Sequence, residues 1–173
     1  TSIPSLAPII TQSLYGNPRQ IKRFLNTFTL RKRLADIAKI SGFDDAVLAK
    51  LMILEYSELT LFKQLYDWQV SQEGAPMEIK ELEVACQDGR LDEKKKELEA
   101  IYPKWSREKI IKWLSVEPKI QDTDLRDYFW ISRDQISSSI LGASLIPPIV
   151  KTLFNKLNQD RLPATVSKSI INT

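Results

Sequence analysis

Apolar residues recur along this chain at the three- and four-residue intervals that are typical of amphipathic helices. The first run covers residues 6–14 and predicts a short helix that stops at Gly16. A second, longer run extends over residues 18–40, and we expect Gly42 to end it, because glycine adopts the left-handed conformation of a helix stop at little cost.

Further runs in the middle of the chain each follow a residue that suits a helix start. We expect Asp44 or Asp45 to cap the third helix and Ser57 to cap the fourth. Pro76 is expected to open a short helix, and Ser106 to cap a later one.

The second half of the chain is less regular. Residues 88–99 are strongly charged, which is typical of a solvated helix face or a linker. We expect Pro118 to end the helix that starts near Ser106. Residues 125–134 mix aromatic and β-branched side chains, so helix and extended structure both stay open. Pro147 and Pro148 are expected to start the last clear helix, and the tail beyond Gln159 to form a short helix or a frayed end.

The predicted fold class is all-α. Neither alternating strand patterns with hairpin turns nor an internal repeat of fixed period occurs, which favours a multi-helix bundle with short connections. We divide the chain into a helical domain over residues 1–88, a charged connector over 89–104 and a C-terminal helical subdomain over 105–173.

Composition excludes most enzyme classes for this chain. It has 173 residues and a net charge of +3, with no histidine and one cysteine, Cys86. Neither a G-x-x-x-x-G-K-[ST] phosphate loop nor G-x-G-x-x-G is present. Cys-His zinc sites and a Ser-His-Asp triad cannot be built without histidine. We therefore expect no catalytic residue, no metal site and no cofactor within the chain itself.

The setting of the chain is also constrained by its sequence. No apolar run approaches the roughly 20 residues that cross a bilayer, and no secretory signal pattern opens the chain, so a cytoplasmic protein without a membrane segment is expected. Because the sequence starts at Thr1 without methionine, we expect it to be part of something larger.

One cluster of basic residues stands out at the start of the long second helix. Asn17 suits the N-cap and Pro18 the first helical position. At about 100° per residue, Lys22 and Arg23 fall within about 60° of Arg19, while the apolar side chains lie opposite.

Arg19 lies where the helix dipole is already positive, which favours a nearby anion. Free N–H groups, the dipole and the guanidinium would then converge on it, and a phosphate fits. Three interpretations stay open from the residues alone: a solvated helix face, a contact with nucleic acid, and a contact with a nucleotide phosphate.

Two segments resemble the KAP family of P-loop NTPases. Residues 16–26, GNPRQIKRFLN, are similar to its G-N-P-R-x-I-K-R-x-x-N segment, and residues 125–134, LRDYFWISRD, are similar to D-L-R-x-Y-x-x-[LI]-[SA]-R-[DE]. The resemblance implies the C-terminal helical region of a bacterial KAP NTPase, similar to the ATPase component of Qat-type antiphage systems. It further implies an AAA+/STAND-type helical lid, here residues 1–88, followed by a C-terminal helical extension.

By this resemblance Arg19 matches a sensor-2 arginine that reaches the γ-phosphate of ATP, with Lys22 and Arg23 as the supporting basic face. ATP and Mg²⁺ would belong to the parent protein, and the P-loop core that holds them would be the partner of this chain. Whether Arg19 acts in cis or in trans stays open. A homo-oligomer and other defence-system proteins are further partners that the resemblance allows.

Two alternatives stand beside the lid. One is a stand-alone nucleic-acid-binding module, with contributions from Lys22, Arg23, Arg31, Lys32 and Arg33. The other is a protein-interaction scaffold. For the second segment we expect either core packing of its aromatic residues or a docking surface, formed by Arg126, Tyr128, Trp130 and Arg133. In the packed case, Arg126 and Arg133 would form ion pairs with Asp127 and Asp134.

Overall fold

The computed structural model describes residues 7–14, 16–87 and 91–133, without the side chains of residues 9 and 91–95. Within these ranges the regular structure is helical, which confirms the predicted all-α class. The helices are α1 (Ala7–Ser13), α2 (Pro18–Ala38), α3 (Asp45–Ser57), α4 (Leu59–Ser71), α5 (Met77–Gln87), α6 (Leu91–Ile101), α7 (Glu108–Ser115) and α8 (Arg126–Ile131).

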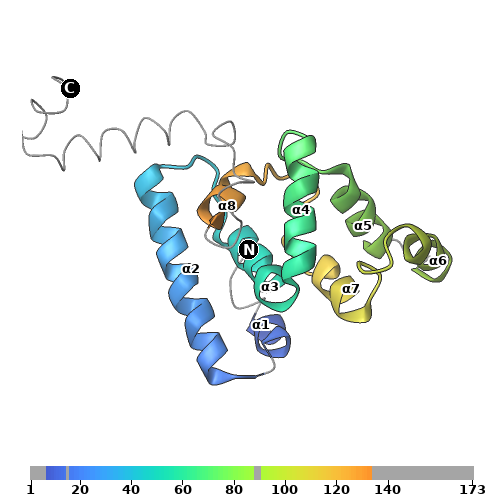
Figure 1. Ribbon diagram of the computed structural model, residues 1–173, viewed down its shortest axis with the longest axis horizontal. Helices are drawn as coiled ribbons and strands as arrows, with labels where there is room; N and C mark the ends of the chain where they lie inside the picture. Colours follow the sequence, from blue (N-terminus) through green and yellow to red (C-terminus); the bar gives the residue numbers. More distant parts are fainter. Residues whose placement is uncertain (1–6, 15, 88–90, 134–173) are drawn as a thin grey trace, which may run out of the picture.

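The centre of the molecule is α3. Every residue from Ala46 to Glu55 is buried, and a helix that is buried all round needs neighbours on every side. Helices α1, α2 and α4 pack directly against it. In Figure 1, α2 lies at one side and α6 at the other, with α3 and α4 between them.

The main hydrophobic core is shared by both halves of the described chain. It runs from Ile10 in α1, through α3 and α4, to Trp113 in α7 and Phe129 in α8. The charged stretch predicted as a connector forms α6, which packs against α5. This core contains residues from both sides of the predicted boundaries at residues 88 and 105. The division of the chain into domains stays a prediction.

The long helix α2 ends earlier than predicted. Lys39, not Gly42, is its C-cap, with a left-handed backbone at φ 51°. The backbone N–H of Lys39 donates to the carbonyl of Asp36, and that of Ile40 to the carbonyl of Ala35. Gly42 has φ 71° and lies in the turn that follows. A lysine can take this conformation because the hydrogen bonds to the last carbonyls compensate for its strain.

Of the predicted side-chain caps, Asp44 is correct and two serines are not. The Asp44 carboxylate accepts from the backbone N–H of Ala46 at 2.7 Å. Ser57 is the last residue of α3, and its hydroxyl donates backwards to the carbonyl of Ile53. Ser106 likewise donates to the carbonyl of Tyr102. A serine hydroxyl can cap the following helix or bond to the carbonyl four residues earlier, and both serines do the latter.

The ambiguous segment is helical over Arg126–Ile131, where it forms α8. The helix predicted after Pro147 and Pro148, and the tail beyond Gln159, lie outside the described residues.

A buried ion pair joins the middle of the molecule to its second half. Lys50 in α3 and Glu83 in α5 both have fully buried side chains, and the Lys50 ammonium donates to the Glu83 carboxylate at 2.8 Å. The same ammonium donates to the carbonyls of Val116 and Pro118, each at 2.9 Å. The backbone N–H of Ile120 donates to Glu83 at 2.9 Å. Each buried charge therefore has several partners, which its burial requires.

The aromatic ring of Trp113 completes this network. The Lys50 ammonium lies 5.0 Å from its ring centroid, within range of a cation–π interaction. The indole N–H donates to the backbone carbonyl of Lys50 at 2.8 Å. Burial lowers the pKa of Lys50, and the Glu83 carboxylate opposes that shift. The loop over residues 116–121 is thereby held against α3 and α5.

We predict that Lys50→Met destabilises the protein by about 3–5 kcal/mol, because it leaves the Glu83 carboxylate buried without its cation. The free energy of unfolding, measured by urea denaturation with circular dichroism, checks this. Lys80→Met is the matched control, since Lys80 pairs with Asp122 at the surface, and such pairs contribute less than about 1 kcal/mol. Equal losses in the two variants would contradict the prediction.

Candidate functional site

The start of α2 has the predicted cap. Asn17 has an extended backbone, and its side-chain oxygen accepts from the backbone N–H groups of Arg19 at 3.0 Å and Gln20 at 3.4 Å. Pro18 is the first residue of the helix. The Asn17 N–H donates to the carbonyl of Leu14 at 3.1 Å. The cap fixes the backbone that carries Arg19.

The same cap corrects one detail of the predicted anion site. Convergence of free backbone N–H groups on an anion was expected, but the N–H groups of Arg19 and Gln20 are bonded to Asn17. The N–H of Ile21 donates to the carbonyl of Asn17. An anion at this end would therefore be held by side chains and the helix dipole.

Arg19, Lys22 and Arg23 are all exposed on α2. Within the described ranges no carboxylate lies within ion-pair distance of them. The first turn of α2 also lacks an acidic residue. Three cations thus lie close together on a rigid helix end without local neutralisation, and they are available to an anion from another part of the protein or from a ligand.

Two other cations of α2 form ion pairs with carboxylates of α3. Arg31 is only 3% exposed, and its guanidinium grips both carboxylate oxygens of Glu55 in α3, with Nη2 to Oε1 at 2.9 Å. Lys32 pairs with Asp45, whose hydrogen bond raises the pKa of Lys32. The expectation that Arg31 contributes to a nucleic-acid surface is wrong, because its side chain is buried against Glu55, whereas the contribution of the half-exposed Lys32 stays a prediction. Arg33 is exposed.

The aromatic residues of α8 belong to the core. Tyr128 and Trp130 are each 4% exposed, so they offer no open docking surface. The Tyr128 ring stacks on Phe43 at 4.6 Å between centroids, and its hydroxyl accepts from the N–H of Asp44 at 2.9 Å. This bond ties α8 to the start of α3.

The ion pair of Arg126 in α8 is different from the expected one. Arg126 pairs with Asp124, not with Asp127, through bonds of 3.0 Å from Nε to each carboxylate oxygen. Burial raises the pKa of Asp127. Arg133 lies over the ring of Trp130, 4.7 Å from the centroid. Asp134 lies outside the described residues.

Residues 16–26 include the start of α2, whereas α8 packs near the end of the same helix. Trp130 and Ile131 pack against Ala35 near the end of the helix. Arg19 lies sixteen residues earlier, which is about 24 Å along the axis at about 1.5 Å per residue. The structure therefore does not bring Arg19 together with Arg126 or Arg133 in one site.

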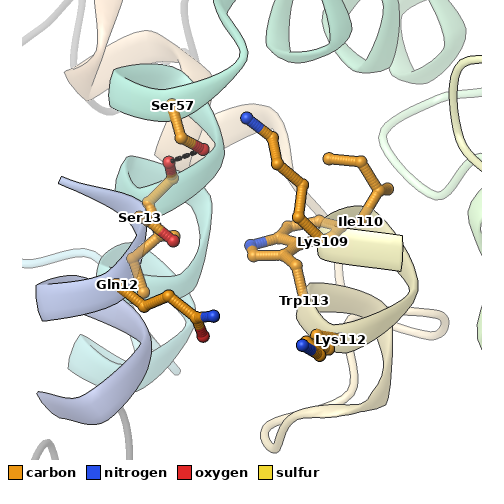
Figure 2. Close-up of a pocket in the computed structure, with 8 residues that line it drawn as sticks. Gln12, Ser13, Ser57, Lys109, Ile110, Lys112 and Trp113 are labelled. Carbon is orange, nitrogen blue, oxygen red and sulfur yellow. Dashed lines mark hydrogen bonds between the residues drawn. The ribbon is translucent and has the colours of Figure 1, made fainter. Parts of the chain in front are cut away.

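The structure also shows a pocket that the sequence did not indicate. It has a volume of about 190 Å³ and lies between α1, the end of α3 and α7 (Figure 2). Its lining consists of Gln12, Ser13, Ile53, Ser57, Lys109, Ile110, Lys112 and Trp113. Ligand pockets usually measure about 300–1,000 Å³, so this one is smaller than a typical ligand pocket. No sequence signal could have found it, because three separate helices line it.

Both lysines at this pocket have acidic partners. Lys112 pairs with Glu108, and Lys109 pairs with Glu58. Burial alone would raise the pKa of Glu58, but hydrogen bonds from Lys109 and Arg107 outweigh it and hold that pKa below its ordinary value. Arg19, Lys22 and Arg23 on α2, by contrast, have no such acidic partner among the described residues.

A smaller observation concerns the surroundings of Arg23. This residue lines an open hollow of about 260 Å³ together with Gln20, Glu55, Tyr56 and Leu59. The Tyr56 hydroxyl donates to the hydroxyl of Thr27 at 3.0 Å. The hollow therefore lies beside the basic end of α2, between that helix and the junction of α3 and α4.

We predict that Asn17→Ala lowers the free energy of unfolding by about 1 kcal/mol, because the N–H groups of Arg19 and Gln20 lose their acceptor. Asn17→Ser keeps an acceptor at this position and should cost much less. Urea denaturation of the two variants checks this, and a loss of the same size in both would count against the role of the cap.

None of the described helices is long and apolar enough to cross a membrane. Within the same residues, no group of three or more acidic or thiol side chains is placed to hold a metal ion. The sequence matches no family model and no curated protein, and the structure matches no solved structure.

Proposed function

We propose that this chain is the C-terminal lid and regulatory region of a P-loop NTPase of the KAP family. In this proposal Arg19 reaches the γ-phosphate of ATP that a separate P-loop core binds together with Mg²⁺. Residues 1–88 act as an AAA+/STAND-type lid, and the remainder as its helical extension. A role in antiphage defence follows from the same resemblance.

The observation that carries the proposal is the state of Arg19 at the capped start of α2. Its side chain is exposed, its backbone is fixed by Asn17, and no described carboxylate neutralises it. An arginine fork binds phosphate oxygens in a bidentate manner, which a lysine does not. Lys22 and Arg23 add positive charge beside it.

The attachment of α2 supports a sensing role. Phe24 is buried and packs edge to face on Tyr56 of α3, with 5.4 Å between ring centroids. The ion pair between Arg31 and Glu55 joins the same two helices about two turns further along α2. A displacement of Arg19 when a phosphate is gained or lost would therefore be passed to α3 as a movement of the whole helix.

We predict that Arg19→Ala in the full-length protein lowers the rate of ATP turnover by about 10³-fold, the low end of what arginine contacts to a transferred phosphoryl group contribute. ATPase assays check this, and circular dichroism should show an unchanged helix content. Lys63→Ala, an exposed cation on α4, is the control and should turn over ATP normally.

Two results would contradict the proposal. One is unchanged ATP turnover in Arg19→Ala. The other is the absence of a phosphate loop from the coding sequence that surrounds this chain, because Arg19 would then have no nucleotide to contact.

A further inference from the structure

The outer face of α2 has the residue spacing of a coiled-coil seam. Counting from Arg19, its positions follow at alternating intervals of four and three residues, the heptad pattern of a and d positions. These positions are Arg19, Arg23, Asn26, Leu30, Arg33 and Ile37. All six side chains are exposed. The pattern therefore forms one continuous stripe on the surface.

The stripe is fixed in place by the opposite side of the same helix. Phe24, Arg31, Ala35 and Ala38 are the buried residues of α2, and they lie roughly opposite the stripe at about 100° per residue. Because Arg31 is held by Glu55 at the centre of this buried side, α2 cannot rotate to hide the stripe. In Figure 1, α2 lies at the side of the molecule.

Two large apolar side chains of the stripe lack cover from the described elements. Leu30 is 66% exposed and Ile37 is 60% exposed. They lie seven residues apart, so they are at equivalent heptad positions on one line of the helix. Because they share one line of α2, a single helix packed along that line would cover both side chains.

The positive charge of the stripe limits which kind of partner can pack on it. Arg23 and Arg33 flank Leu30 on the seam, and neither has a carboxylate within ion-pair distance in the described part of the chain. The only acidic residue of α2 is Asp36. A partner must therefore present apolar side chains in line with Leu30 and Ile37 and negative charge beside them.

We propose that the outer face of α2 is a docking surface for an acidic amphipathic helix of a partner protein, which pairs along the heptad stripe. Leu30 and Ile37 bury against apolar residues of that helix. Its carboxylates pair with Arg23 and Arg33, and Asn26 at a seam position sets the register. This proposal does not depend on the nucleotide contact of Arg19, because the apolar part of the stripe begins eleven residues after it.

Three other occupants fit the observations less well. A second copy pairing through the same face would set arginines against arginines. Residues 134–173 of the chain are themselves net basic, with Lys151, Lys156, Arg161 and Lys168 against Asp134 and Asp160. Nucleic acid would satisfy the arginines but would leave Leu30 and Ile37 in water.

The test uses the full chain and a synthetic helical peptide of three heptads, with leucine at its a and d positions and glutamate at e and g. Fluorescence anisotropy should show saturable binding that weakens as salt is added. The Leu30→Ala/Ile37→Ala variant should bind at least about tenfold more weakly, because two buried side chains are truncated. Arg33→Glu should weaken binding by a similar factor.

Matched controls distinguish binding at this surface from nonspecific binding. Met77→Ala removes a 66% exposed side chain from α5 and should leave the affinity unchanged. A peptide with lysine in place of glutamate should not bind. Circular dichroism should show the same helix content in all variants, since every substituted side chain is exposed.

Several outcomes would overturn the proposal. Absent binding, or equal binding of the acidic and basic peptides, would remove the acidic helix as occupant. A DNA duplex that binds more tightly than the peptide, with no effect of Leu30→Ala/Ile37→Ala, would assign the surface to nucleic acid. A dimer of the chain, seen by light scattering and lost in the same variant, would assign it to a second copy.

Discussion

The pair formed by Lys50 and Glu83 holds together stretches of chain that local propensity would leave apart. Lys50 belongs to the central helix α3, Glu83 to α5, and their remaining hydrogen bonds go to the loop that follows α7. Burying two charges is costly unless every polar atom finds a partner. The loop over residues 116–121 supplies these partners, so its path is tied to the pair, and α8 begins only five residues beyond it.

The basic residues of α2 illustrate how one helix divides its charges among different tasks. Arg31 faces α3 and is neutralised by Glu55, while Lys32 reaches Asp45 at the start of the same helix. Arg19, Lys22, Arg23 and Arg33 face outward. The first two contacts fix the orientation of α2. The remaining cations are presented to the surroundings as a consequence of that orientation.

The two proposed contacts of α2 share Arg23 but otherwise use different lengths of the helix. Arg19 lies at the capped start, where the helix dipole assists an anion. Leu30 and Ile37 lie in the second half, whose inner side packs against α8 through Ala35. Because α2 is one continuous helix, occupation of either region can affect the position of the other. A partner helix on the outer face would then be able to influence a phosphate contact at the start.

A cluster of tryptophan rings connects α4 with α7. Trp105, Trp113 and Trp68 pack against one another, with the Trp105 and Trp68 rings stacked at 5.1 Å. The Trp105 N–H donates to Gln64 at 2.9 Å. These rings join α4 to α7 and to the segment before it.

Local sequence determined the helices and the cap at Asn17, because hydrophobic period and capping chemistry act within a few residues. The exposed Arg19, Lys22 and Arg23 could be placed in the same way, from one helical wheel. Tertiary structure decided what depends on distant partners. The ends of helices were predicted less well even where the hydrogen bonds are local: the hydroxyls of Ser57 and Ser106 bond to carbonyls four residues earlier, and α2 stops at Lys39 before the glycine.

The burial of Arg31 and of Lys50 shows the same limit most clearly. Each is a cation in the sequence like its exposed neighbours, and only the carboxylate that the fold places opposite it, Glu55 or Glu83, permits its burial. Residues 125–131 were compatible with helix or strand, and packing of Tyr128 and Phe129 against Phe43 and Phe62 selected the helix. A sequence pattern specifies which face of a helix is apolar, whereas the partner of a buried charge comes from a residue far away in the chain.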